Sequence, residues 1–156
     1  MESIHPLIVH FPIALLLTSF LLDSAGWLFK RPGLHIVGLW NLWLGTLGAA
    51  AAALSGLQAE DVVAKHSFEI GQVIEWHKRL GVATLILGCV IVGWRLWRWD
   101  QLSRLERPVS LLLALVMCVS LIAGAYLGGR LVYEFGVGGS FGTSDSYIDT
   151  PTPHRH

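Results

Sequence analysis

The stretch VSLLLALVMCVSLIAGAYLGG, residues 109–129, decides the fold because it contains no charged residue. A helix that crosses a bilayer needs about 20 mostly apolar residues, and this stretch has that length. Comparable apolar stretches cover residues 6–29, 36–57 and 80–97. With short connections, four such segments use nearly all of the 156 residues. The sequence therefore predicts an all-α integral membrane protein, a four-helix bundle of up-down-up-down order.

The composition agrees with a membrane protein. Hydrophobic residues make up 53% of the chain and charged residues only 14%, which is more apolar than a soluble domain of this length. The formal net charge is zero and the basic residues are scattered, so nucleic-acid binding is excluded. Cys89 and Cys118 both fall in apolar stretches and are interpreted as small hydrophobic residues.

The connections predict one membrane domain, residues 1–138, followed by a flexible polar tail, residues 139–156. The first apolar stretch ends at a basic turn with two helix breakers, Lys30-Arg31-Pro32-Gly33, and no basic segment precedes it, so it is interpreted as a retained helix. The polar segment 58–72 is interpreted as a loop that leads into the third helix. Pro108 is expected to open the fourth helix at its first position. Phe141 and Tyr147 could dock the tail on a partner.

The distribution of basic residues indicates the orientation in the membrane. The connections after the first and third apolar stretches hold Lys30, Arg31, Arg95, Arg98, Arg104 and Arg107, and the opposite side holds Lys65, Lys78, Arg79 and Arg130. Because basic residues favour the cytoplasmic side, both termini are predicted to be extracytoplasmic. The expected location is the bacterial inner membrane, with surrounding lipid.

Small residues at four-residue spacing indicate where helices pack closely. Such stripes are formed by Gly45, Ala49, Ala52 and Gly56, by Gly81, Thr84 and Gly88, and by Ser120, Gly124 and Gly128. One small bundle cannot readily use all of this surface. The sequence therefore predicts a partner, either a larger membrane complex or a second copy of the chain.

Most polar residues of chemical interest gather where both termini lie. They are His5, His10, Glu60, Asp61, His66, Glu69, Glu75, His77, Arg130, Tyr133 and Glu134. Imidazole binds haem iron, copper and zinc, and helical bundles can hold cofactors between facing helices. His10 and His77 form the best pair for a b-type haem, with Arg130 available to a propionate and Gly81 and Gly88 leaving room for the macrocycle.

Two other interpretations of these histidines stay open. A copper or zinc site could use His5, His10, His66 and His77 with nearby carboxylates, although no ligand motif of known spacing is present. Alternatively, the histidines are structural, with His5 as a helix cap and His66 facing water. At the other end of the bundle, Asp23 is expected near the headgroups or paired with Arg95 or Asn41.

The opening HPLIVHFPIAL, residues 5–15, resembles the start of a bacterial membrane family known as domain of unknown function 2231. The small-residue second helix, His77 and the ending GGRLVYEFGVG, residues 128–138, are similar too. This resemblance implies a four-helix membrane protein without an established activity, whose relatives occur with Rieske or cytochrome-type partners. In the family the last motif often carries histidines where this chain has Arg130 and Phe135.

Two functions therefore stay open. The first is a small membrane subunit of a respiratory or photosynthetic electron-transfer complex, binding b-type haem or a metal. The second is a cofactor-free accessory subunit that stabilises a larger membrane complex. Enzymatic activity is the least favoured class, because no nucleophile motif, phosphate-binding loop or paired carboxylates are present. The sequence does not identify the metal, the redox partner, the oligomeric state or a role for quinone.

Overall fold

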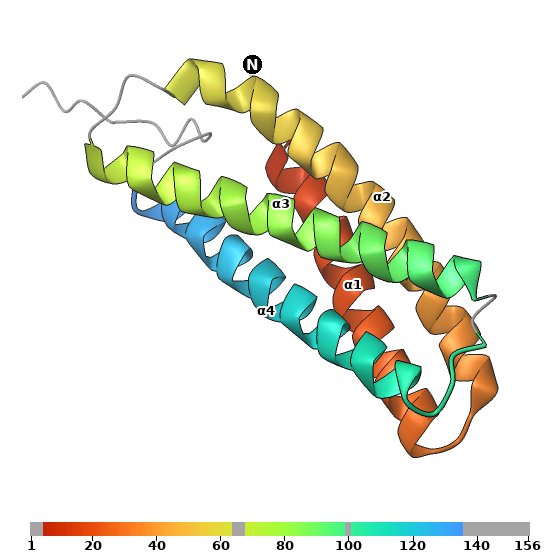
Figure 1. The fold of residues 1–156 in the computed structure, drawn as a ribbon. Coiled ribbons are helices and arrows are strands. Elements are labelled where there is room, and N and C mark those ends of the chain that lie inside the picture. Colours follow the sequence, from red (N-terminus) through yellow and green to blue (C-terminus); the bar gives the residue numbers. More distant parts are fainter. Residues whose placement is uncertain (1–4, 64–67, 99–100, 136–156) are drawn as a thin grey trace, which may run out of the picture.

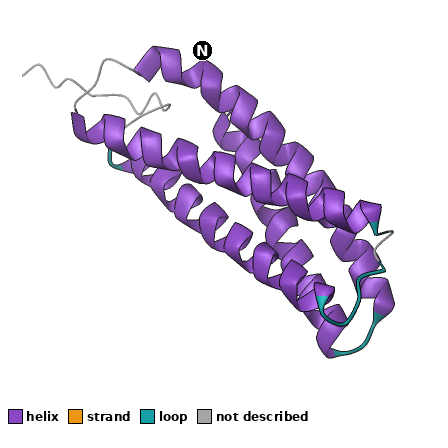
Figure 2. Ribbon diagram, in the orientation of Figure 1, coloured by secondary structure: helices purple, strands orange, loops and turns teal. Residues whose placement is uncertain are grey.

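The computed structural model describes residues 5–63, 68–98 and 101–135 (Figure 1). Within these residues the chain forms four helices and no strand: α1 His5–Leu28, α2 Pro32–Val63, α3 Phe68–Trp97 and α4 Glu106–Tyr133. Figure 2 shows that a short connection joins α1 to α2. Each helix is long and apolar enough to cross a membrane. The predicted all-α membrane bundle is confirmed, whereas the orientation of its termini stays a prediction.

Neighbouring helices run antiparallel (Figure 1). α1 packs against α2 and α4, and α3 packs against the same two helices, so α1 and α3 lie on a diagonal. One end of the bundle, here called the His77 end, holds the starts of α1 and α3 and the ends of α2 and α4. The other, here called the Arg95 end, holds residues 29–31 between α1 and α2, and residues 98 and 101–105 between α3 and α4.

Two helix boundaries differ from the sequence prediction. Most of the polar segment 58–72 is helical, because α2 continues to Val63 and α3 begins at Phe68. Ala, Gln and Glu are good helix formers, and they extend the helices beyond their apolar parts. α4 begins at Glu106, so Pro108 is its third residue rather than its first. Proline is tolerated there because the first N–H groups of a helix have no partner within it.

Local hydrogen bonds fix the connections at the Arg95 end. α1 ends with the N–H of Arg31 donating to the carbonyl of Gly26 at 2.9 Å, while Lys30 takes a φ of 52°. This is the Schellman arrangement of a helix C-terminus. Before α4, the Ser103 hydroxyl accepts from the N–H of Glu106, and the Glu106 carboxylate accepts from the N–H of Ser103, as in a capping box.

The outer surface of the bundle is apolar. Large side chains on all four helices are more than half exposed, among them Leu21, Leu54, Ile86 and Ile122. A narrow core contains Leu16, Leu42, Ile91 and Met117, which are almost completely buried. Lipid tails solvate apolar side chains, so the exposed positions suit a bilayer, and helical hydrogen bonding satisfies the backbone.

The contact between α1 and α2 is close because glycines occupy the facing positions. The α1 side chains that meet α2 glycines are Phe11, Pro12, Leu15, Leu16 and Asp23, opposite Gly48, Gly45 and Gly38. Small residues allow two helix backbones to approach and so increase dispersion contacts, which drive helix association in lipid. The predicted stripes contribute at Gly45, Gly88, Gly124 and Gly128, whereas a β carbon added to Gly81 would meet no atom within 4 Å.

Replacing Gly45 by alanine tests this contact. A β carbon there would lie 2.8 Å from Leu16 Cδ2 and 3.2 Å from Leu15 Cβ, whereas one on Gly93 would meet nothing within 4 Å. We expect Gly45→Ala to lower the free energy of unfolding by about 1–3 kcal/mol. Gly93→Ala should raise it by up to about 1 kcal/mol, since alanine favours helix. Circular dichroism during unfolding in detergent measures both, and equal stabilities would contradict the predicted contact.

Candidate functional site

At the His77 end, the side chain of His77 is fixed by α4. Its Nδ1 lies 2.8 Å from the carbonyl oxygen of Gly124. A carbonyl only accepts, so Nδ1 carries the proton and donates it. The ring lies against Gly128, where a β carbon would be 3.0 Å from Cε1. The absence of a side chain at Gly128 therefore leaves room for the half-buried imidazole to reach the carbonyl of Gly124 on α4.

The other predicted haem-site residues have different surroundings. His10 is exposed on α1, the helix diagonal to α3. Arg130 Nε donates to Glu134 Oε2 at 2.7 Å, and its guanidinium lies 5.8 Å from the Phe135 ring centroid. The structure leaves open space beside Gly81, one turn after His77, but a β carbon on Gly88 would lie 2.7 Å from Thr46 Oγ1. Gly81 is therefore exposed to the surroundings of the bundle, whereas Gly88 is packed against α2.

The predicted metal ligands are only partly covered by the structure. The side chain of His5 and all of His66 lie outside the described residues, as does the tail 139–156 with Phe141 and Tyr147. Among the side chains that the structure does describe, there is no group of three or more His, Cys, Asp or Glu that could hold a metal ion. The haem and metal sites stay predictions.

The Arg95 end contains a buried polar cluster that joins three helices. It consists of Asp23 from α1, His35 from α2 and Arg95 from α3, which are 7%, 8% and 1% exposed. We call it the Asp23 cluster. Arg95 Nη1 donates to Asp23 Oδ2, and Arg95 Nη2 donates to the His35 carbonyl oxygen at 3.0 Å. The Nδ1 of His35 lies 3.1 Å from Asp23 Oδ1.

Two glycines and a serine position the Asp23 cluster. A β carbon on Gly38 would lie 2.8 Å from Asp23 Oδ1, and one on Gly26 would lie within 3.0 Å of three atoms of the His35 ring. The Ser19 hydroxyl donates to the Gly38 carbonyl at 2.8 Å. These contacts bring α1 and α2 together at the place where their polar side chains meet.

The electrostatics of the Asp23 cluster are balanced. Arg95 is always protonated, and its charge is offset by the Asp23 carboxylate that it contacts. An ionised carboxylate only accepts, so the Nδ1 of His35 donates to Asp23. The described part of the chain leaves no buried side-chain nitrogen or oxygen without a hydrogen-bond partner.

Of the alternatives expected for Asp23, the structure shows the pair with Arg95, but sequence reasoning missed the contribution of His35. The sequence analysis assigned no role to His35. The sequence contained a signal for this contact. Two antiparallel helices joined by the turn at residues 29–31 place residues at equal distances from the turn opposite each other. This register places His35 opposite Gly26 and Asp23 opposite Gly38.

Removing Arg95 tests the energetic importance of the Asp23 cluster. We expect Arg95→Met to lower the free energy of unfolding by about 3–5 kcal/mol, because Asp23 keeps a buried charge without its partner. The double variant Asp23→Leu with Arg95→Met should be more stable than Arg95→Met alone. Arg79→Met is the control, since the pair of Arg79 with Glu75 is exposed and such pairs contribute up to about 1 kcal/mol. Thermal unfolding in detergent measures the stability of each variant. Equal losses of stability in Arg95→Met and Arg79→Met would refute the prediction.

Comparison with known proteins agrees with this architecture. Residues 1–140 match a family described as "Predicted membrane protein (DUF2231)". No curated protein and no solved structure is significantly similar to the chain. The family match covers all four helices, from the start of α1 to the end of α4. The chain therefore belongs to the membrane protein family named domain of unknown function 2231.

Proposed function

We propose that this chain is a small subunit of an electron-transfer complex in the bacterial inner membrane, and that His77 is a ligand of a b-type haem or a metal. Its family membership supports the membrane location in general terms. His10 is the proposed second ligand. The proposed redox partner is a Rieske or cytochrome-type protein, in a respiratory or photosynthetic complex.

The orientation of the His77 ring carries this proposal. Histidines that bind metals usually donate their other ring N–H to a carbonyl or carboxylate, which fixes the tautomer and the direction of the ring. The bond from His77 Nδ1 to the Gly124 carbonyl has this form and orients the ring for coordination through Nε2. The open space beside Gly81, one turn further along α3, would admit the edge of a flat macrocycle.

Asparagine at position 77 separates ligation from helix packing. Its short amide can still donate to the Gly124 carbonyl, but it offers no imidazole Nε2. We expect the purified wild-type protein to show a haem Soret band and His77→Asn to lack it while retaining the wild-type unfolding temperature. Metal analysis of the same samples tests the metal alternative.

Lys78→Ala is the matched control, because it changes the neighbouring residue and leaves the imidazole in place. It should retain the cofactor. The proposal is refuted if wild-type protein prepared with haem and metals supplied contains neither, or if His77→Asn binds the cofactor as the wild type does.

A cofactor-free accessory subunit is the second candidate. The observation that favours it is the exposed backbone of α3, since β carbons on Gly71, Gly81 and Gly93 would meet nothing within 4 Å. A helix from another subunit could approach such a surface closely. In this case the bond between His77 and Gly124 serves only to join α3 to α4.

Assembly distinguishes the accessory function from a protein that acts alone. We expect gentle detergent extraction to release the chain in a larger complex or as an oligomer, and Gly81→Leu to weaken that assembly because a bulky side chain blocks close approach. Gly33→Leu is a control, since its surroundings are also open but it lies at the Arg95 end. Native mass measurement tests this. If the wild type were found only as a monomer, neither a larger complex nor an oligomer would be supported.

A further inference from the structure

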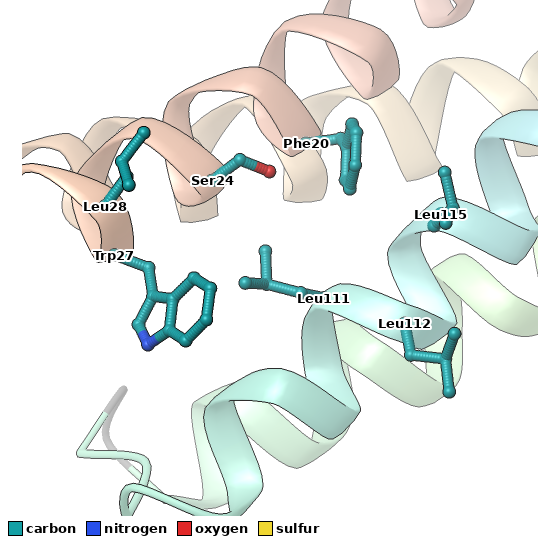
Figure 3. A pocket seen from close by; sticks show the side chains of 7 residues that line it. All are labelled: Phe20, Ser24, Trp27, Leu28, Leu111, Leu112 and Leu115. Carbon is teal, nitrogen blue, oxygen red and sulfur yellow. The ribbon is translucent and has the colours of Figure 1, made fainter.

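An apolar groove lies between α1 and α4 at the Arg95 end (Figure 3). It has a volume of about 320 Å³ and is lined by Phe20, Ser24, Trp27, Leu28, Leu111, Leu112 and Leu115. The sticks in Figure 3 show these side chains on two facing helices. The groove belongs to neither the Asp23 cluster nor the histidines of the other end.

The shape of the groove follows from how α1 and α4 pack. Of the neighbouring helix pairs, α1 and α4 make the fewest contacts. α1 uses Asp23 and Gly26 to approach α2, which leaves Ser24 and Trp27 on the side facing α4. The lining is almost entirely apolar and open toward the surroundings of the bundle. Its chemistry therefore suits a hydrocarbon chain rather than a polar solute.

Basic residues lie where the groove meets the end of the bundle. Arg107 precedes Leu111 by one helical turn and so lies on the same face of α4. Lys30 and Arg31 directly follow the end of α1, whose residues Trp27 and Leu28 line the groove. Tryptophan is favoured at the headgroup level of a bilayer, and arginine directs its guanidinium toward the same level.

The acidic groups that the structure describes at this end are already engaged. Asp23 contacts Arg95 and His35, and the Glu106 carboxylate accepts from Arg98 Nη2 at 3.1 Å. By sequence, this end has six basic residues (Lys30, Arg31, Arg95, Arg98, Arg104 and Arg107) and three acidic ones (Asp23, Asp100 and Glu106), so it carries a positive excess beside the apolar groove. This combination matches an amphiphile with a hydrocarbon chain and an anionic headgroup.

We infer that the groove between α1 and α4 binds an anionic glycerophospholipid. One acyl chain lies along Phe20, Ser24 and Leu112, and the phosphate lies at the level of Arg107, Lys30 and Arg31. The positive charge at this end favours an anionic lipid over a zwitterionic one. The groove gives one lipid molecule a defined position, unlike the lipids that surround the rest of the bundle. The inference is independent of any cofactor at His77.

Lipid retention measures this selectivity. Full-length protein is reconstituted in vesicles of equal parts phosphatidylglycerol and phosphatidylcholine, extracted gently and analysed by native mass spectrometry. We expect one phosphatidylglycerol to be retained in preference to phosphatidylcholine. Arg107→Gln should lower that preference about fivefold, which corresponds to about 1 kcal/mol for one basic residue near an anionic surface.

Two further variants make the result specific. Ser24→Phe fills the groove without changing charge and should reduce retention of phosphatidylglycerol, whereas Arg79→Gln removes an exposed charge at the His77 end and should have no effect. Circular dichroism verifies that each variant is folded. Equal retention of both lipids by the wild type would overturn the inference, as would equal preferences in Arg107→Gln and Arg79→Gln.

Discussion

The ion pair between Asp23 and Arg95 is the constraint around which the bundle is arranged. These residues come from α1 and α3, the two helices on the diagonal, so their contact crosses the interior. An unpaired charge in a spanning segment is costly, by about 2.5–3.5 kcal/mol on insertion scales at the membrane centre. Each of the two side chains therefore needs the other. Arg95 also donates to the His35 carbonyl, which includes α2 in the same contact.

The ion pair determines where glycine is needed. The carboxylate of Asp23 packs against Gly38 of α2 and the ring of His35 packs against Gly26 of α1, so the absence of side chains at these glycines permits α1 and α2 to lie close together beside the ion pair. α1 and α2 also lie close together further along the helices, where Leu16 packs against Gly45. Polar contacts at one end and dispersion contacts along the helices thus act together. This combination is expected in lipid, where burial of apolar surface alone contributes little to helix association.

Sequence alone predicted the helices and named Arg95 as one of the possible partners of Asp23, because the length and polarity of a spanning segment restrict both. Length and hydropathy define a spanning segment, and a charge inside such a segment has few available partners. His35 was not predicted, since its role depends on the register between two helices and on what glycine permits opposite it. The extension of α2 to Val63 was also missed, because apolar length defines the membrane crossing and not the end of the helix.

The same reasoning explains how far the His77 site could be predicted. The sequence identified His77, but it could not identify Gly124 as the acceptor of its proton, because that depends on the packing of α4. α4 takes no part in the Asp23 cluster and is joined to α3 by the bonds of His77 with Gly124 and of Ser120 with Leu80. Its contact with α1 is the looser one and contains the groove. A molecule that fills the groove would therefore stabilise the position of α4, and with it the carbonyl that orients His77.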